Sequence, residues 1–469
     1  MYSIFKKDLF EKAEYVYQEH SKFDQGKIAL GELYSHQESR LQAVLKYVIS
    51  GSSFYQNHLS VLTPKDIDSF SLKDIQRLPF TTKEDLRAQG SAMLSTPLAD
   101  SWIYYETTGT TGKPTPCPRN ELDSIYNNTP LIINYRKIFE KHGSKHIVGV
   151  MGPTELHSTG DTFEDVLRSL GHSVVKMWPR SPVVGMKRVM NLIQELKITA
   201  LVCTPAVAIG LARFMREHDL SPAKSSVKLI LTLGELTTPE LLRNIGEIWD
   251  AKLYNCMYAS QESSILAVGT DDNYLYTVPY NNFYEVVDPE TGNTIESNKR
   301  AVTGELVITH LYKGQKPLIR YRTGDMVNAT PMPNGQLKIV PIGRVKDRLL
   351  LNGITYSAWQ LESTILKKLH NCLDYAVQID SHLGFDCLHI TVELAKALID
   401  QHEQLEDAKN YIESQLKNVS VHLEVGTTTN VTGTSAMVSW KAARLHDLRH
   451  ESDNSDRNAA LTLVSGGFK

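Results

Sequence analysis

ITALVCTPAVAIGLARFMREH, residues 198–218, is the stretch that decides the fold class. Its first part, 198–203, is a short apolar run of the kind that forms a buried strand. Its second part repeats apolar residues at helical spacing, and Thr204 before Pro205 supplies the expected N-cap and first helical position. The stretch therefore predicts a strand that leads directly into a helix.

The same alternation extends on both sides. Apolar runs at 146–152, 173–179, 227–234 and 252–258 alternate with helical patterns at 185–196 and 239–250. Thr238 and Pro239 repeat the threonine–proline start of the first helix. Strands and helices that alternate at this spacing form βαβ units, so we expect a parallel sheet with helices on both faces.

Other parts of the chain follow different patterns. Residues 1–60 have helical periodicity, and Thr82 can cap a helix that begins at Lys83. Residues 283–296 and 326–340 each read as strand, turn and strand, and Asn334–Gly335 is a strong hairpin signal. A helix, two strands, a helix and a strand follow between 357 and 425. The predicted fold is α/β: a large N-terminal domain (1–345) with parallel sheets flanked by helices and an antiparallel β portion, plus a small α+β C-terminal domain (346–469).

Composition limits the class of protein. The 469 residues are 41% hydrophobic and 22% charged, as in an ordinary soluble globular protein. The net charge of −3 gives no support for nucleic-acid binding or for binding to an anionic membrane. The N-terminal segment lacks a continuous apolar core, so we expect neither signal peptide nor membrane span, and a cytoplasmic protein. The five cysteines are widely spaced without C-x-x-C, which predicts buried free thiols and no structural zinc.

TTGTTGKP, residues 107–114, has the residue types of a phosphate-binding loop. Glycines allow close backbone approach, and backbone N–H groups, threonine hydroxyls and Lys113 can bind oxyanions. It is not a Walker A loop, because only two residues separate Gly109 from Gly112 and Pro114 follows the lysine. Taken alone, the stretch is either a phosphate loop or an ordinary Gly/Thr-rich turn.

Four later stretches contain charged residues that are candidates for ligand binding. They are YASQES (258–263), YRTGD (321–325), GRVKDRLLLNG (343–353) and SWKAAR (439–444). Glu262 follows a strand of the sheet, where open α/β sheets bind ligands. Each charge alone has an ordinary structural explanation, but their order along the chain is more informative.

That order resembles the adenylate-forming superfamily of acyl-CoA synthetases and adenylation domains, and within it the phenylacetate–CoA ligase family. The resemblance covers about residues 78–446. It rests on LPFTTKEDLR, TTGTTGKPT, VCTPAVAI, LGELTTPELLR, FYEVVDPETG, GELVIT, IRYRTGD and NGITYSAWQLE, in this order and spacing. Members join a carboxylic acid to the α-phosphate of ATP, release pyrophosphate, and then pass the acyl group to a thiol.

The resemblance implies a role for each site residue. Glu262 would hold Mg²⁺, and Asp325 would accept hydrogen bonds from the ribose hydroxyls, with Arg344 nearby. Lys441 would be the catalytic lysine, and the small domain would swing about Lys346. The loop that would wrap the β- and γ-phosphates consists of Thr107, Thr108, Gly109, Thr110, Thr111, Gly112 and Lys113. The nucleotide and acid pocket would include Gly234, Glu235, Met257, Tyr258 and Ala259.

Several positions depart from the family pattern. Cys256 and Ala259 replace the usual Asn and Gly around the tyrosine, and Gln261 replaces the Ser or Thr before the acid. Trp440 replaces the usual glycine before the catalytic lysine, which leaves the conformation of the lysine loop open. We still expect activity, because the charged groups all remain.

Three functions follow from the resemblance. The first is ATP- and Mg²⁺-dependent activation of a carboxylic acid, aryl or similar, with transfer to CoA. The second is the same activation with transfer to the phosphopantetheine arm of a carrier protein in biosynthesis. The third is a nucleotide-binding regulator without turnover. The resemblance also permits a homodimer, whereas the acid, the acceptor and the oligomeric state are not readable from the sequence.

Overall fold

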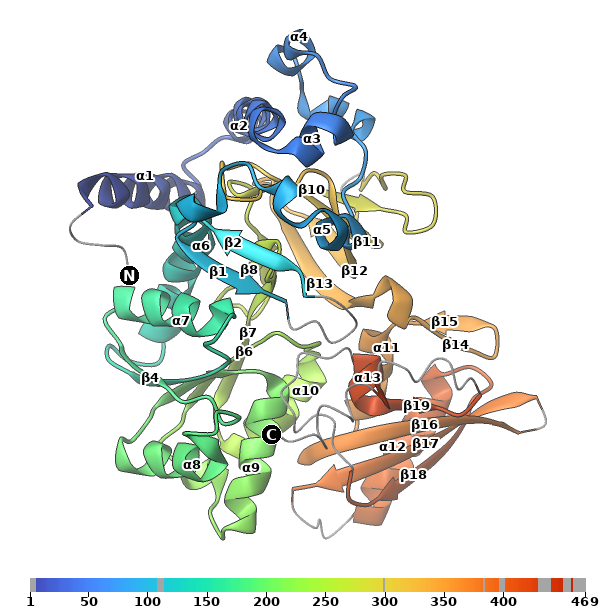
Figure 1. The fold of residues 1–469 in the computed structure, drawn as a ribbon. Coiled ribbons are helices and arrows are strands. Elements are labelled where there is room, and N and C mark those ends of the chain that lie inside the picture. Colours follow the sequence, from blue (N-terminus) through green and yellow to red (C-terminus); the bar gives the residue numbers. More distant parts are fainter. Residues whose placement is uncertain are drawn as a thin grey trace. The chain divides into compact units, whose positions relative to one another are not determined.

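The computed structural model of the chain describes residues 6–107, 114–297, 300–382, 384–395, 401–428, 440–449 and 457–458 (Figure 1). The chain divides into two compact units. The first contains Met1–Ser144, Pro153–Gly171 and Cys256–Pro341, and the second contains Lys145–Gly152, His172–Asn255 and Ile342–Lys469. The predicted small domain from residue 346 lies within the second unit, and its separate movement stays a prediction.

Helices open the first unit, as the periodicity of residues 1–60 predicts. The Thr82 hydroxyl accepts a hydrogen bond from the Asp85 N–H, and the Asp85 carboxylate accepts one from the Thr82 N–H, so the predicted cap at Lys83 is confirmed. The helices are α1 (Lys7–Asp24), α2 (Leu30–Gly51), α3 (Ser53–His58), α4 (Pro64–Asp68), α5 (Lys83–Gln89), α6 (Glu121–Glu140) and α7 (Ser158–Ser169), with 3₁₀ turns at Leu72–Arg77, Gly90–Met93 and Leu98–Asp100.

The strands of the first unit are paired mainly antiparallel. The order is β10-β11-β12-β13-β9-β8-β7, and a separate hairpin joins β1 to β2. The predicted turn at Asn334–Gly335 connects β12 to β13, whereas the second strand expected within 283–296 is reduced to one bridge between Val287 and Thr294. The bounds are β1 (Ile103–Glu106), β2 (Pro116–Arg119), β7 (Lys252–Ser260), β8 (Ser264–Gly269), β9 (Leu275–Thr277), β10 (Asn282–Val287), β11 (Val302–His310), β12 (Tyr321–Pro331) and β13 (Leu337–Arg344).

The second unit contains the predicted parallel sheet. Its order is β7-β6-β5-β3-β4, where β7 belongs to this unit through Asn255 and to the first unit from Cys256, and the pairs β3–β4, β3–β5 and β5–β6 are parallel. Thr204 and Thr238 each accept a hydrogen bond from the third helical N–H, so both predicted helix starts are confirmed. The elements are β3 (Ile147–Met151), β4 (Ser173–Lys176), α8 (Gly185–Glu195), β5 (Ala200–Cys203), α9 (Pro205–Glu217), a 3₁₀ turn (Pro222–Lys224), β6 (Leu229–Leu233) and α10 (Pro239–Trp249).

A second sheet, with strand order β18-β17-β16-β19, belongs to the C-terminal part of this unit. This C-terminal part contains the strands and helices predicted between 357 and 425. It also contains the short strand β19, which the sequence pattern did not indicate. The elements are a 3₁₀ turn (Val345–Asp347), β14 (Leu349–Leu351), β15 (Ile354–Tyr356), α11 (Ala358–Leu366), β16 (Cys372–His382), β17 (Phe385–Leu394), α12 (Gln401–Gln415), β18 (Ser420–Val425), α13 (Trp440–Arg444) and β19 (Leu445–Asp447).

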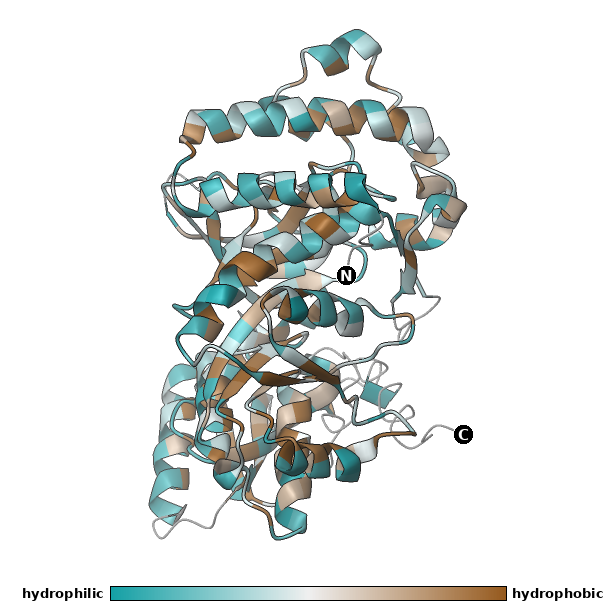
Figure 2. Cartoon of the chain, turned by 90° about the vertical axis from the view of Figure 1, so that its left-hand side faces the viewer, coloured by the Kyte–Doolittle hydropathy of each residue, from teal (hydrophilic) through white to brown (hydrophobic). Residues whose placement is uncertain are grey.

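Each unit has its own hydrophobic core, and the mixed α/β class is confirmed. In the second unit, one core runs from Trp249 and the side chains of α9 and α10 to α11 and the strands β16 and β17. Most helices carry hydrophilic and hydrophobic residues together along their length (Figure 2), as expected for helices that bury one face. Among the described residues, no helix is both long enough and apolar enough to cross a membrane.

Candidate active site

The predicted phosphate loop lies between β1 and β2. Residues 108–113 (Thr108, Gly109, Thr110, Thr111, Gly112 and Lys113) are outside the described part of the chain. At the base of the loop, the Thr107 N–H donates to the Thr115 carbonyl at 3.1 Å, and the Thr115 N–H donates to the Thr107 hydroxyl at 2.9 Å. The loop is thus closed by a paired hairpin, and its contact with phosphate stays a prediction.

Glu262 lies in the tight turn between β7 and β8, and only 6% of its side chain is exposed. The Lys83 ammonium lies 3.3 Å from Oε1, and the Tyr321 hydroxyl donates to the same oxygen at 3.1 Å. Burial alone would raise the pKa of Glu262, but Lys83 and these hydrogen bonds lower it overall. The carboxylate is therefore kept ionised although it is buried.

Asp325 is the last residue of an irregularity in β12. The pairing of β11 with β12 shifts register so that the three residues between Arg322 and Met326 face a single residue, Leu306, between Glu305 and Val307. Gly324 has φ of +74°, in the left-handed region that glycine adopts without steric cost. The bulge re-aims the chain, and the Tyr258 hydroxyl donates to Asp325 Oδ2 at 2.7 Å. The structure thus brings together Tyr258 and Asp325, which the sequence predicts separately, one for the acid or adenine pocket and the other for the ribose.

Glu305 on β11 holds this bulge in place. Its carboxylate is buried, accepts a hydrogen bond from the Gly324 N–H at 3.1 Å, and pairs with the Arg322 guanidinium. A charged acceptor for a bulge N–H satisfies a backbone group that the ladder leaves unpaired. Glu305 and Arg322 therefore shape the Asp325 position.

Gln261, one of the departures from the family pattern, has a local role. The Ser158 hydroxyl and backbone N–H both contact its Oε1, and its Nε2 donates to the Glu106 carbonyl at 3.4 Å. The side chain therefore ties the turn that carries Glu262 to the end of β1 and the start of α7. A Ser or Thr at this position is too short to make both contacts.

Gly234 and Glu235 follow β6 in the second unit. Gly234 has φ of +79°, which explains the glycine at this turn. The Glu235 carboxylate accepts a hydrogen bond from the Ala206 N–H at 3.0 Å, in the first turn of α9. Desolvation raises the pKa of Glu235 to about 7, although Ala206 and Thr204 act in the opposite direction. This carboxyl group therefore titrates near neutral pH.

The residues predicted for the hinge end one strand and begin a short turn. Arg344 is the last residue of β13, and Lys346 is the middle residue of the 3₁₀ turn Val345–Asp347. Both side chains are exposed, whereas Asp347 is buried. A single-turn element between two sheets is a suitable place for a backbone change, but the hinge stays a prediction.

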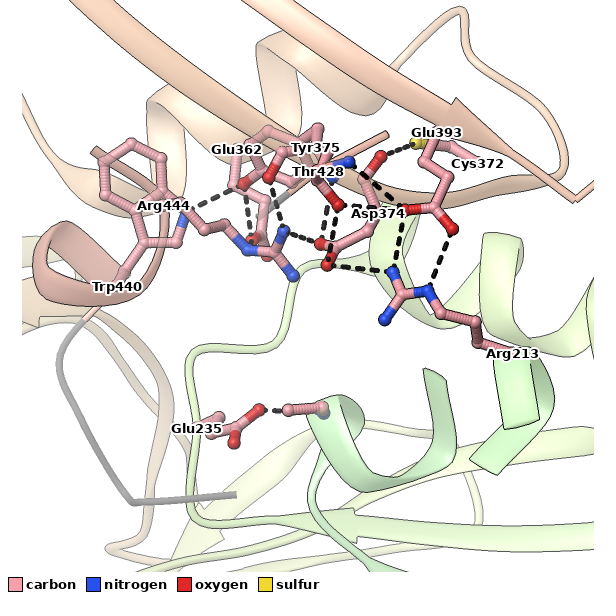
Figure 3. A network of polar contacts seen from close by, with 11 residues as sticks. Arg213, Glu235, Glu362, Cys372, Asp374, Tyr375, Glu393, Thr428, Trp440 and Arg444 are labelled. Atoms are coloured by element: carbon pink, nitrogen blue, oxygen red, sulfur yellow. Dashed lines mark hydrogen bonds and ion pairs between the residues drawn. The ribbon is translucent and has the colours of Figure 1, made fainter. Parts of the chain in front are cut away.

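Lys441 is the second residue of α13, whose two end residues are anchored in the core of the second unit (Figure 3). At one end, the buried Trp440 indole donates from Nε1 to the Tyr375 hydroxyl at 2.8 Å. At the other end, Arg444 pairs with Asp374, donates to the Tyr375 carbonyl at 3.0 Å, and stacks over the Tyr375 ring. The indole at the family's glycine position thus fixes α13, and with it the backbone of Lys441.

The anchor of α13 is a buried network of charges (Figure 3). Tyr375 donates to Glu362 at 2.8 Å, and Asp374 is shared by Arg444 and Arg213. Burial would lower the pKa of Arg444, but Asp374, Tyr375 and Glu362 raise it above its ordinary value. The guanidinium therefore stays charged and offsets the buried carboxylates.

Comparison with known proteins identifies the family of this chain. The sequence pattern described as "AMP-binding enzyme" matches residues 58–312, more than half of the chain. The chain belongs to the AMP-binding, or adenylate-forming, enzyme family. The predicted family and the predicted enzyme class, an adenylate-forming ligase, are thus confirmed.

Individual proteins of known function are also similar to this chain in sequence. The phenylacetate–coenzyme A ligase of Pseudomonas putida is 26% identical over 429 residues, covering 89% of this chain and 94% of the relative. The enzyme of the same name from Thermus thermophilus is 26% identical over 379 residues, covering 77% and 81%. Among solved structures, 2-hydroxyisobutyryl-CoA ligase in a postadenylation state, with an acyl-AMP bound, superposes with a TM-score of 0.74 at 20% identity over 93% of each chain. At this identity the structural match shows the fold alone.

The predicted site residues of this chain are divided between its two units. Thr107, Tyr258, Ala259, Glu262 and Asp325 belong to the first unit. Gly234, Glu235, Arg344, Lys346 and Lys441 belong to the second.

The contacts of Lys83, Tyr321 and Glu305 and the anchor of α13 were not predicted from the sequence. Lys83 and Tyr321 stand within stretches that carry the resemblance, but nothing in their own pattern indicates the carboxylate that each contacts.

Proposed function

We propose that the protein activates a carboxylic acid, aryl or similar, as its acyl-adenylate and transfers the acyl group to the thiol of CoA. The observation that carries this proposal is the pair of carboxylates Glu262 and Asp325 in one unit, each held by a tyrosine hydroxyl. One is ionised and buried in a turn at the end of a strand, and the other is aimed by a bulge. The ionised Glu262 therefore suits a cation, and Asp325 suits the hydroxyls of a sugar.

Glu262 fits the role of a magnesium ligand. It is an ionised oxygen donor, which Mg²⁺ prefers, and the contacts of Lys83 and Tyr321 both fall on Oε1. Oε2 is therefore the oxygen with which a cation would be held. Bound Mg²⁺ would neutralise charge on the phosphates of ATP. The Lys83 ammonium would have to share this carboxylate with the metal.

Asp325 and Tyr258 would recognise the nucleoside. A carboxylate accepts hydrogen bonds from two vicinal hydroxyls, and Tyr258 fixes the rotamer in which Asp325 does so. Thr107 and residues 108–113 would hold the pyrophosphate end of ATP through backbone N–H groups and the Lys113 ammonium. Arg344 would add a cation near the ribose.

Lys441 would supply the charge for the chemical step. The acid carboxylate and the α-phosphate are both anionic, so the barrier to their reaction falls when an ammonium lies between them. A backbone fixed by Trp440 and Arg444 would present this ammonium in one orientation. Movement about Lys346 would then withdraw Lys441 when the thiol attacks.

A neutral Glu235 would favour an anionic substrate in the acid pocket. Its pKa of about 7 leaves a large share of the carboxyl groups protonated at neutral pH. A protonated carboxyl donates a hydrogen bond to the substrate carboxylate, whereas an ionised one repels it.

Transfer to the phosphopantetheine arm of a carrier protein is the second candidate. The named relatives are CoA ligases, and this favours CoA as the acceptor. A nucleotide-binding regulator is the third candidate, but Trp440 and Gln261 no longer support it because each has a structural role.

The test has two stages. Exchange of labelled pyrophosphate into ATP is measured over a panel of aryl, fatty and amino acids, with an acid-free blank. The proposal predicts exchange that depends on an aryl or similar acid; no exchange with any acid would favour the regulator. The accepted acid is then offered with CoA or with a pantetheinylated carrier protein, and thioester on the carrier alone would replace the first candidate by the second.

A further inference from the structure

One face of the C-terminal sheet carries four side chains that can bind a metal. Cys387 and His389 lie two residues apart on β17, so they point to the same face. His422 on β18 pairs directly with His389, and Asp380 on β16 pairs directly with Cys387. Three neighbouring strands thus present a thiol, two imidazoles and a carboxylate together.

The distances between these groups are short. The candidate ligand atoms of Cys387, His389 and His422 all lie within 4.8 Å of one another. The two imidazole rings are stacked, with centroids 5.0 Å apart and planes at 12°. Tetrahedral zinc with sulfur and nitrogen ligands sets neighbouring ligand atoms about 3.6 Å apart, so small side-chain rotations would close the set.

Two of these groups, Cys387 and His422, are available as metal ligands, as their hydrogen bonding indicates. Within the part of the chain that the structure describes, neither the buried Cys387 thiol nor the exposed His422 imidazole makes a hydrogen bond. His389 differs, because its Nε2 lies 3.0 Å from Asp380 Oδ2. A carboxylate that accepts from one imidazole nitrogen orients the ring and leaves the other nitrogen, Nδ1, for a metal.

We propose that Cys387, His389 and His422 form a zinc site, with Asp380 orienting His389. The donor set selects a borderline-soft ion: thiolate and imidazole suit Zn²⁺, whereas Mg²⁺ and Ca²⁺ prefer oxygen. On binding, the sulfur–zinc bond forms and the thiol proton passes to solvent. This proposal revises the expectation of no structural zinc, which considered only C-x-x-C and similar spacings.

Zinc at this site would stabilise the edge of the C-terminal sheet. Among the described strands, β18 is the last in the order β18-β17-β16-β19 and pairs with β17 alone. Zinc held by His422 and the two β17 ligands would join this edge strand to its neighbour through side chains as well as backbone. Bound Zn²⁺ therefore stabilises the folded unit by mass action.

The experiment uses the full-length protein without a histidine tag. The apo protein is titrated with Zn²⁺ by calorimetry and with Co²⁺ by absorption, because a thiolate ligand gives cobalt a charge-transfer band in the near ultraviolet. The proposal predicts one equivalent of metal, a cobalt–thiolate band, and a higher Tm with Zn²⁺. Cys387→Ser removes the band, His422→Ala weakens Zn²⁺ binding at least tenfold, and Asp380→Asn weakens it roughly tenfold.

His402→Ala is the matched control, since His402 is an exposed histidine of α12 in the same unit. It should bind Zn²⁺ like the unmodified protein. If Cys387→Ser fails to fold because its thiol is buried, the exposed His422→Ala variant decides the question. Zinc binding that is absent, or equally strong in His422→Ala and His402→Ala, would overturn the proposal.

Discussion

The Trp440 indole donates a hydrogen bond to the Tyr375 hydroxyl across 2.8 Å, and Tyr375 in turn donates to Glu362. A residue next to the expected catalytic lysine is thereby tied to the core of the second unit. The family's glycine at this position could not make such a contact. Here a departure from the family pattern supports the lysine segment instead of disrupting it.

Trp440→Phe should lower stability modestly, because it keeps most of the packing and removes the N–H donor. The expected loss is about 1 kcal/mol of unfolding free energy. Trp440→Gly should cost roughly 3 kcal/mol or more, because it also empties a buried ring site. Denaturant unfolding measures both, and Trp102→Phe, an exposed tryptophan of the first unit, is the control. Equal stability of the two Trp440 variants would contradict the anchor.

Arg444→Met should be among the most damaging single changes in the second unit. Removing the guanidinium leaves Asp374 and Glu362 buried with less compensating charge, and breaking a buried ion pair from one side costs about 3–5 kcal/mol. Urea unfolding measures the loss, and Lys417→Met on an exposed position is the control. A loss no larger than that of Lys417→Met would mean that the network is not stabilising.

Tyr258→Phe should weaken nucleotide binding through Asp325. Without the hydroxyl, Asp325 loses the contact that fixes its rotamer, and one hydrogen bond of about 1 kcal/mol corresponds to roughly a fivefold higher Kd for ATP. Calorimetric titration with ATP and Mg²⁺ checks this. Tyr284→Phe is the matched control, since its hydroxyl donates to the Leu266 carbonyl in the same unit. Tyr284→Phe should change stability and leave the Kd for ATP unchanged.

The fold was predictable where a local pattern decides it. The threonine–proline starts at Thr204 and Thr238 and the Asn334–Gly335 turn each act through their immediate neighbours, and the structure confirms them. The strands β14, β15 and β19 were missed because three residues are too few to show periodicity.

The site was predictable as a set of residues but not as a set of contacts. Glu262 and Asp325 could be selected from their motifs, whereas the bulge at Gly324 depends on pairing with Glu305, which lies elsewhere in the sequence. Arg444 meets Asp374 from 70 residues away. Such contacts are set by the tertiary fold, and no single-sequence spacing reports them.

The raised pKa of Glu235 predicts that the free energy of unfolding depends on pH. Its pKa rises from 4.5 to about 7 on folding, so the folded state binds more protons than the unfolded state between these values. Stability should therefore be highest below about pH 4.5 as far as this group is concerned, and fall by up to roughly 3 kcal/mol as the pH rises through 7. Glu235→Gln should remove this part of the pH dependence. Unfolding curves from pH 5 to 8 that are parallel for the two proteins would contradict the raised pKa.

The role of Lys441 in adenylation is tested most directly by acid-dependent exchange of pyrophosphate into ATP, measured for Lys441→Ala beside the unmodified protein and Lys417→Ala. Fluorescent ATP-analogue binding on the same samples reports whether the nucleotide site is intact. Lys441→Ala should lose exchange by at least a hundredfold while it still binds nucleotide, and Lys417→Ala should be unchanged. Exchange by Lys441→Ala at the unmodified rate would contradict this role.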